Sequence, residues 1–249
     1  MTSRLPNWFP YPSTPRVRSL LLLSVVIAVL AAVNVADKFG PPHTGLVVGP
    51  VVALALLALA RRAGLTWHDI GLSRHTIGTG LKYAIVAVLA VAALYALGAA
   101  LPWTRAAFLD VRYQLHMGAA LLVALVVVPL GTVLLEEVAF RGILHGLVHR
   151  HRGALWASGS SSALFGLWHI LPSLRLNRAN HAVGGLLGAN PTGQILAVLA
   201  AVGFTALAGL LLCELRRRSG SLLAAAGLHW ATNGLAVLLT AAVATLRLA

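Results

Sequence analysis

The sequence predicts an all-α protein, a polytopic membrane helix bundle of seven to eight transmembrane helices. Of the 249 residues, 59% are hydrophobic and only 10% are charged. The mean hydropathy is +0.86, far above what the core of a soluble protein this size requires. Apolar runs recur at lengths close to the roughly 20 residues that a helix needs to cross a bilayer. The alternating pattern of a transmembrane β-barrel is absent.

The expected spans follow one another along the chain at 19–36, 46–60, 83–101, 117–140, 154–171, 194–213 and 221–246. The second run is short and contains Pro50, and 172–193 has room for a re-entrant piece, so the predicted number is seven or eight. We expect residues 1–18 to form an N-terminal interfacial tail and 19–249 a single transmembrane domain. The first run lacks a small-residue cleavage site directly after it, which favours an uncleaved anchor.

The net charge of +13 is explained by membrane topology, because the basic residues lie between the apolar runs and form no patch with interleaved aromatics. We therefore expect no nucleic-acid partner. With a cytoplasmic N-terminus, the inside segments carry twice as many Lys and Arg residues as the outside segments, which supports that orientation. Arginine greatly outnumbers lysine, a composition associated with GC-rich bacterial genomes, so the expected location is a bacterial inner membrane.

Two adjacent glutamates, Glu136 and Glu137, interrupt the fourth apolar run in the stretch "LLEEVAFRGIL". The four other carboxylates lie between the runs or at a run's end. An ionisable group near the bilayer centre costs roughly 2.5–3.5 kcal/mol on insertion scales, so such residues usually face the bundle interior and mark function. The alternative is that the pair caps the cytoplasmic end of its helix.

Arg141 lies four residues after Glu137, where it can neutralise that carboxylate on one helical face. Because Glu136 is rotated by about 100° from Glu137, the two can have different roles. One carboxylate can be held by the arginine while the other points at a substrate or a metal. Proton affinities of two such close carboxylates also separate, as acid and base roles require.

Two later spans carry polar pairs four residues apart, Phe165 with His169 and His229 with Asn233. Glu136 and His169 lie at similar distances from the turn at Arg152, so an antiparallel hairpin brings them to the same depth. His229 is somewhat shallower and reaches the same cavity if its span is tilted. The chain contains no H-E-x-x-H, G-x-S-x-G or Walker-type loop, which argues against a common zinc protease, a serine hydrolase and a nucleotide-using enzyme.

The segments "EEVAFR", "FGLWH" and "HWATN", in this order and each in a separate apolar span, resemble the three-motif pattern of the CAAX-protease and bacteriocin-processing family of intramembrane endopeptidases, abbreviated CPBP and also called Abi. The pattern E-E-x-x-x-R, F-x-x-x-H and H-x-x-x-N is met without departure. The resemblance covers a core of about 117–240. The stretch "LTWHDIGLSRH" at 65–75 also resembles the amphipathic segment that often precedes this core.

The resemblance implies that a peptide bond of a membrane-associated protein or peptide is hydrolysed inside the membrane by a water activated by glutamate and histidine. The implied catalytic residues are Glu136, Glu137, Arg141, His169, His229 and Asn233. We expect substrate contacts from Phe165, Trp168 and Trp230. Either no cofactor is used or zinc is held by Glu136, His169 and His229. Asn233 favours the metal-free version, because an amide suits an oxyanion donor better than a zinc ligand.

Two readings from other functional classes remain open. Intramembrane Glu, His and Arg sets also serve transporters and proton relays, although this sequence lacks the repeated halves typical of many transporters. A non-catalytic immunity or scaffold protein can share the fold, because fold does not fix function. In the protease reading the partners are the lipid bilayer and a protein or peptide substrate.

Overall fold

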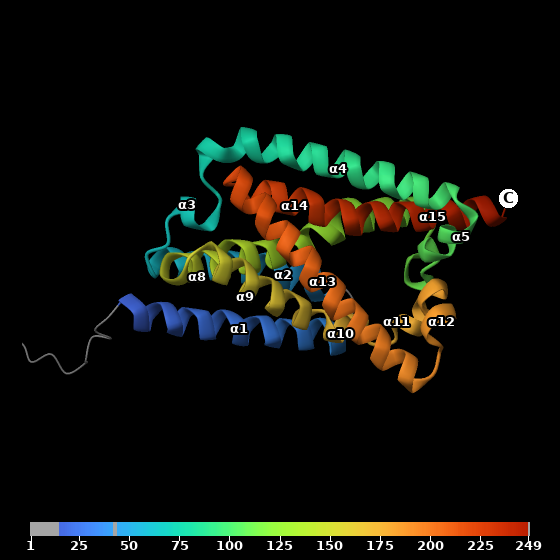
Figure 1. Ribbon diagram of the computed structural model, residues 1–249, viewed down its shortest axis with the longest axis horizontal. Helices are drawn as coiled ribbons and strands as arrows, with labels where there is room; N and C mark the ends of the chain where they lie inside the picture. The colour runs from blue at the N-terminus through green and yellow to red at the C-terminus, as the bar shows by residue number, and fades with distance from the viewer. Residues whose placement is uncertain (1–14, 42–43, 249) are drawn as a thin grey trace, which may run out of the picture.

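The computed structural model describes residues 15–41 and 44–248, and these form helices without a named strand. Figure 1 shows most long helices running along the long axis of the bundle, with α13 crossing the others obliquely. The longer helices, in chain order, are α1 (Pro15–Phe39), α2 (Thr44–Arg62), α4 (Ile77–Ala100), α9 (Ala154–Trp168), α13 (Pro191–Ser219) and the pair α14 (Leu222–Trp230) and α15 (Ala236–Leu248).

A continuous helix made of five segments carries the glutamate motif between α4 and α9. The segments are α6 (Met117–Leu122), η4 (Val123–Val133), α7 (Leu134–Glu136), η5 (Glu137–Leu144) and α8 (His145–Arg152). The backbone of η4 and η5 is π-helical, as is η6 (Ala231–Leu235), which joins α14 to α15. Pro129 lies inside η4, and its ring would crowd the carbonyl four residues earlier in a regular α-helix. π-Helical turns are rare and frequently occur at functional sites.

Short helices form the connections. Near the α2–α4 turn lie α3 (Trp67–Ile70) and η1 (Arg74–Thr76). The α4–α6 connection contains α5 (Pro102–Arg105), η2 (Ala106–Phe108) and η3 (Val111–Tyr113), and the α9–α13 connection contains α10 (Ile170–Ser173), α11 (Leu176–Ala179) and α12 (His181–Leu187). These last two connections meet at one end of the bundle through an isolated bridge between Asp110 and Asn180.

Six helical stretches of the described chain are long and apolar enough to cross a membrane. They are Ser19–Phe39, Thr44–Arg62, Trp67–Ala100, Met117–Arg152, Pro191–Ser219 and Leu222–Thr245. The expected span at 154–171 is the 15-residue helix α9, which ends at Trp168 and is followed by α10. The number of seven to eight spans therefore stays a prediction. Of the predicted tail, residues 1–14 lie outside the described residues, and α1 begins at Pro15.

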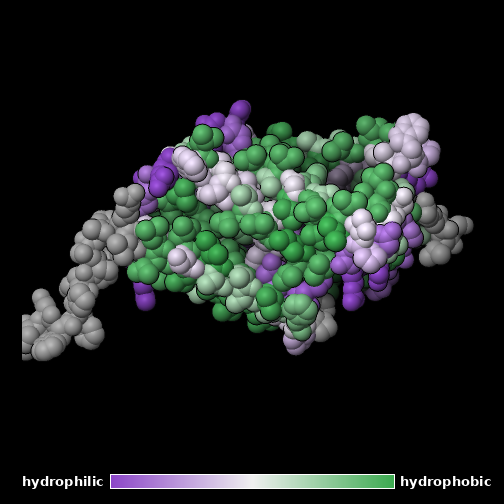
Figure 2. Space-filling view, turned by 60° about the horizontal axis from the view of Figure 1, so that its bottom comes forward, coloured by the Kyte–Doolittle hydropathy of each residue, from purple (hydrophilic) through white to green (hydrophobic). Residues whose placement is uncertain are grey.

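The surface explains the high hydrophobic content of the chain. Many large apolar side chains are exposed, Leu155 by 84% and Phe204 by 72%. Figure 2 shows hydrophobic residues over the middle of the molecule and hydrophilic residues gathered towards its ends. An apolar belt with polar ends fits a protein surrounded by lipid, and the chain is an integral membrane protein.

The segment around α3 is fixed to the end of the bundle that carries most of the arginines. Thr66 and Asp69 form a capping box at the start of α3, and Arg150 pairs with Asp69 at 2.6 Å. The buried Arg216 donates to the carbonyls of His68 and Asp69. Gly71 lets this guanidinium approach, because a Cβ there would lie 2.1 Å from its Nε and because φ is +84°.

Candidate active site

Glu137 is buried and its Oε1 accepts two hydrogen bonds. Nη1 of Arg141 donates from 3.0 Å and Nδ1 of His229 donates from 2.7 Å. The arginine comes from the next turn of the same helix, as the sequence predicts, whereas the histidine comes from α14, 92 residues later. Since a carboxylate can only accept, Glu137 fixes the orientation of the His229 ring and directs its Nε2 to the opposite side.

Glu136 has a different environment. Its Oε1 accepts a hydrogen bond of 2.9 Å from the indole Nε1 of Trp168, which lies at the end of α9. Its Oε2 lies 3.7 Å from Nε2 of His229 and is a buried atom with no hydrogen-bond partner among the described residues. One oxygen of Glu136 is therefore held by the protein, and the other is available to a ligand or water.

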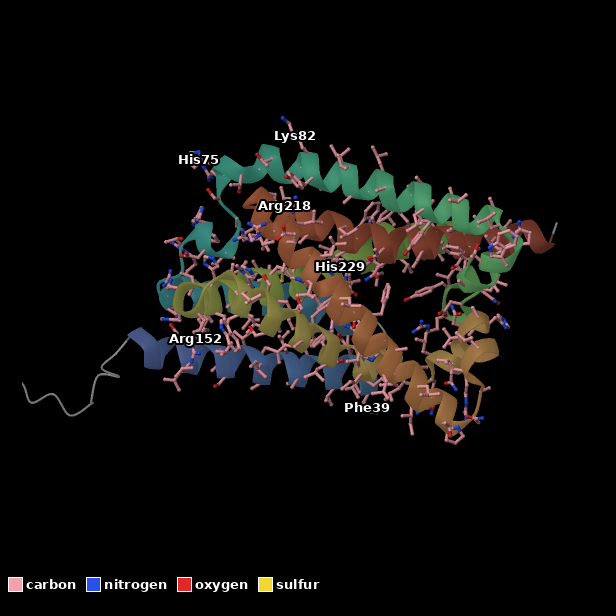
Figure 3. The ribbon with its side chains drawn as sticks, in the orientation of Figure 1. Phe39, His75, Lys82, Arg152, Arg218 and His229 are labelled. Atoms are coloured by element: carbon pink, nitrogen blue, oxygen red, sulfur yellow. The ribbon has the colours of Figure 1, made fainter. Side chains whose placement is uncertain are left out.

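The ring of Phe165 contacts Arg141, His169 and His229. The Arg141 guanidinium lies 3.8 Å above the centroid of its ring, a distance at which a cation–π interaction is strong. The rings of His169 and His229 approach the same phenyl ring edge-on, with centroids 4.6 and 5.6 Å away. Phe165 thus brings the three motifs of the sequence into one cluster, and Figure 3 places His229 near the middle of the bundle.

His169 is half-buried and lies at the C-terminal end of α9. Its Nδ1 donates to the carbonyl of Phe165 at 2.8 Å, because a carbonyl can only accept. In the neutral ring the lone pair is then on Nε2. Asn233 is also half-buried and follows His229 by one turn, within η6.

Of the aromatic residues expected to contact substrate, Phe165 is 3% exposed, and Trp168 is bound to Glu136. The indole of Trp230 donates to the carbonyl of Ala124 at 2.8 Å and thereby ties α14 to η4. Contact of these three residues with a substrate stays a prediction. The structure gives each of them a role within the protein.

The zinc set expected from the sequence stays a prediction. Among the described residues, no group of three or more His, Cys, Asp or Glu side chains is placed to hold a metal ion. Of the three expected ligands, His229 uses Nδ1 on Glu137 and Glu136 uses Oε1 on Trp168, while Oε2 of Glu136 has no hydrogen-bond partner among the described residues. We therefore derive no chemical step through a metal.

Sequence reasoning missed Asn34, which reaches the site from α1. Its Nδ2 donates to the backbone carbonyl of Trp168 at 2.7 Å. Asn34 and Trp168 also line a cavity of about 260 Å³ between α1 and α9, whose other walls are apolar. The sequence contains one signal for this contact. Pro172 has no N–H to donate to the carbonyl of Trp168, four residues earlier, so that carbonyl needs another donor.

Comparison with protein families agrees with this cluster. Residues 118–235 match the family described as type II CAAX prenyl endopeptidase Rce1-like, and this range contains every motif residue from Glu136 to Asn233. Neither the comparison with curated proteins nor the comparison with solved structures gives a match. The segment 118–235 is thus similar to the Rce1-like proteins, in agreement with the resemblance to the CAAX-protease and bacteriocin-processing family.

Proposed function

We propose that this protein is a glutamate-dependent intramembrane endopeptidase that hydrolyses a peptide bond of a membrane-associated protein or peptide. The carrying observation is the unequal treatment of the two adjacent carboxylates. Oε2 of each glutamate is buried without a hydrogen-bond partner among the described residues, but Oε1 of Glu137 is bonded to Arg141 and His229. Oε1 of Glu136 accepts only from Trp168, and its Oε2 lies 3.7 Å from Nε2 of His229. A general base needs such an oxygen within hydrogen-bond reach of the water that it deprotonates.

In the proposed reaction Glu136 takes a proton from a water while the water oxygen attacks the peptide carbonyl carbon. The lone pair on Nε2 of His169 accepts a second hydrogen bond from this water. The carbonyl π pair moves onto oxygen and produces a tetrahedral oxyanion. Collapse of this intermediate breaks the C–N bond, and the leaving amine takes the proton from Glu136.

The oxyanion needs preorganised donors, and His229 and Asn233 are the proposed ones. In this role His229 is an imidazolium, with Nδ1–H bonded to Glu137 and Nε2–H directed to the oxyanion. The Arg141–Glu137 pair keeps the ring oriented, as a third group commonly orients a catalytic histidine. The side-chain amide of Asn233 supplies a second N–H one turn further along the same helix.

The test is cleavage of a peptide library by purified protein in liposomes, followed by mass spectrometry. We expect discrete cleavage products, activity that survives exhaustive chelation, and substoichiometric zinc. Activity that disappears on zinc removal and returns on zinc addition would replace the metal-free mechanism with a metal-dependent one. Glu136-dependent ion or solute flux with an unchanged peptide pool would overturn the peptidase proposal in favour of a transporter.

A further inference from the structure

The helix α9 stops short because of its sequence. In a regular α-helix the carbonyl of Trp168 would accept from residue 172, but Pro172 has no N–H. Within the bilayer an unsatisfied carbonyl has no water to bind and is costly. The side-chain amide of Asn34 on α1 takes the missing donor's place, at 2.7 Å. The break in α9 is thus bonded to a different helix.

The same tryptophan holds Glu136 through its side chain. Its Nε1 donates to Oε1 at 2.9 Å, and its ring packs edge-on against Phe140 with centroids 6.0 Å apart. With Oε1 held in this way, Oε2 lies towards Nε2 of His229. One residue therefore connects α1 to Glu136, by its backbone carbonyl on one side and its indole on the other.

We infer that Trp168 is a positioning residue for the general base and that Asn34 acts on Glu136 through Trp168. Helix α1 lies outside the family-matched segment 118–235, yet it supplies the bond that fixes this tryptophan. The inference rests on the proposed function for the role of Glu136. The two hydrogen bonds that carry it can be tested without any cleavage activity.

The first experiment replaces Trp168 with 3-benzothienylalanine, which keeps the shape of the bicyclic ring and has no N–H. Hydrogen bonds to charged groups contribute enough that we expect kcat to fall about 10- to 100-fold. KM should change by less than about twofold, because the bond acts on the base and not on substrate affinity. The same replacement at Trp156, which is 62% exposed on α9, is the matched control and should leave both constants unchanged. An unchanged kcat, or a change confined to KM, would overturn the inference.

The second experiment measures coupling between Asn34 and Trp168. Asn34→Leu introduces an apolar side chain of similar size and removes the donor, so kcat should fall in the otherwise unaltered protein. If Asn34 acts through the indole, the same substitution should have no further effect on kcat in the benzothienylalanine protein. Independent, multiplying effects would show that Asn34 does not act through Trp168.

A spectroscopic measurement separates this inference from the proposed function. In protein with ¹⁵N-labelled tryptophan, each of the six indoles gives an N–H resonance. The Trp168 resonance, assigned with Trp168→Phe, should move in both Asn34→Leu and Glu136→Gln, while that of Trp156 stays in place. If the Trp168 resonance moves but the protein cleaves no peptide, the two hydrogen bonds that join Asn34, Trp168 and Glu136 are supported and the peptidase proposal is rejected. If the Trp168 resonance does not move in either variant although the wild-type protein cleaves peptides, only the positioning role is rejected.

Discussion

At the residue scale, the two adjacent glutamates are held by different partners, Glu137 by Arg141 and His229 and Glu136 by Trp168. The spacing from Glu137 to Arg141 is local, so a helical face predicts it, and the pair is present at 3.0 Å. The indole bond to Glu136 joins residues 32 apart and depends on ring orientation, which a sequence pattern does not specify. The substrate contact expected of Trp168 stays a prediction, and its bond to Glu136 was not predicted.

The buried ion pair should matter for folding. Arg141 is fully buried, and Arg141→Met would leave Glu137 with His229 as its polar partner, so we expect the free energy of unfolding to fall by about 3–5 kcal/mol. Denaturant titration in detergent micelles measures the change. Glu137→Gln combined with Arg141→Met removes both charges and should recover much of the loss.

The control for this prediction is Arg218→Met. Arg218 pairs with Glu214 near the end of α13, and the two side chains are 60% and 36% exposed. Because an exposed pair typically contributes little to stability, the loss should be smaller than for Arg141. Equal losses at the two positions, or a fully stable Arg141→Met protein that is inactive, would assign the arginine to the chemistry instead.

At the element scale, the hairpin was predictable and the local helix geometry was not. Counting residues from the turn at Arg152 predicted that Glu136 and His169 share a depth, and the bond to Glu136 from the adjacent Trp168 agrees. The π-helical turns of η5 and η6 were missed, because apolar spans lack a periodicity that separates 3.6 residues per turn from a wider turn. The early end of α9 has a cause in the sequence, because Pro172 has no N–H for the carbonyl of Trp168.

Close packing of α9 on α13 should depend on Gly166. A Cβ at this position would lie 2.7 Å from the carbonyl oxygen of Val202. We expect Gly166→Val to destabilise the protein by about 1–3 kcal/mol, because backbone atoms cannot move aside as side chains do. Gly159, on the same helix with open space around it, supplies the control variant Gly159→Val. Thermal unfolding compares the two, and equal stability would contradict this packing.

At the scale of the whole molecule, composition alone predicted a lipid-embedded helix bundle, because no other environment accommodates so much exposed apolar surface. The number of spans was less predictable, since a 15-residue helix such as α9 is apolar but short. Helix α9 packs along α13. Arginines that flank the spans give an orientation only through a statistical rule.

The orientation can be measured directly. The arginine distribution predicts that the α8–α9 turn is cytoplasmic and that the α11–α12 connection faces the opposite side. Arg152→Cys and His181→Cys place thiols at these exposed positions, and the native Cys213 is buried. A membrane-impermeant maleimide should label residue 181 in right-side-out vesicles and residue 152 in inverted vesicles. The reverse pattern would invert the topology.

The most direct test of the account is the turnover number of Glu136→Gln on a peptide cleaved by the wild-type protein. Glutamine keeps an oxygen to accept the Trp168 bond but cannot take a proton at the free position. We predict a kcat at least ~10²-fold lower than wild type, the contribution expected of a general base, with thermal stability and substrate binding retained. Glu214→Gln, at an exposed ion pair on α13, is the matched control and should cleave normally. A folded Glu136→Gln protein that turns over at the wild-type rate would contradict the assignment of Glu136 as the base.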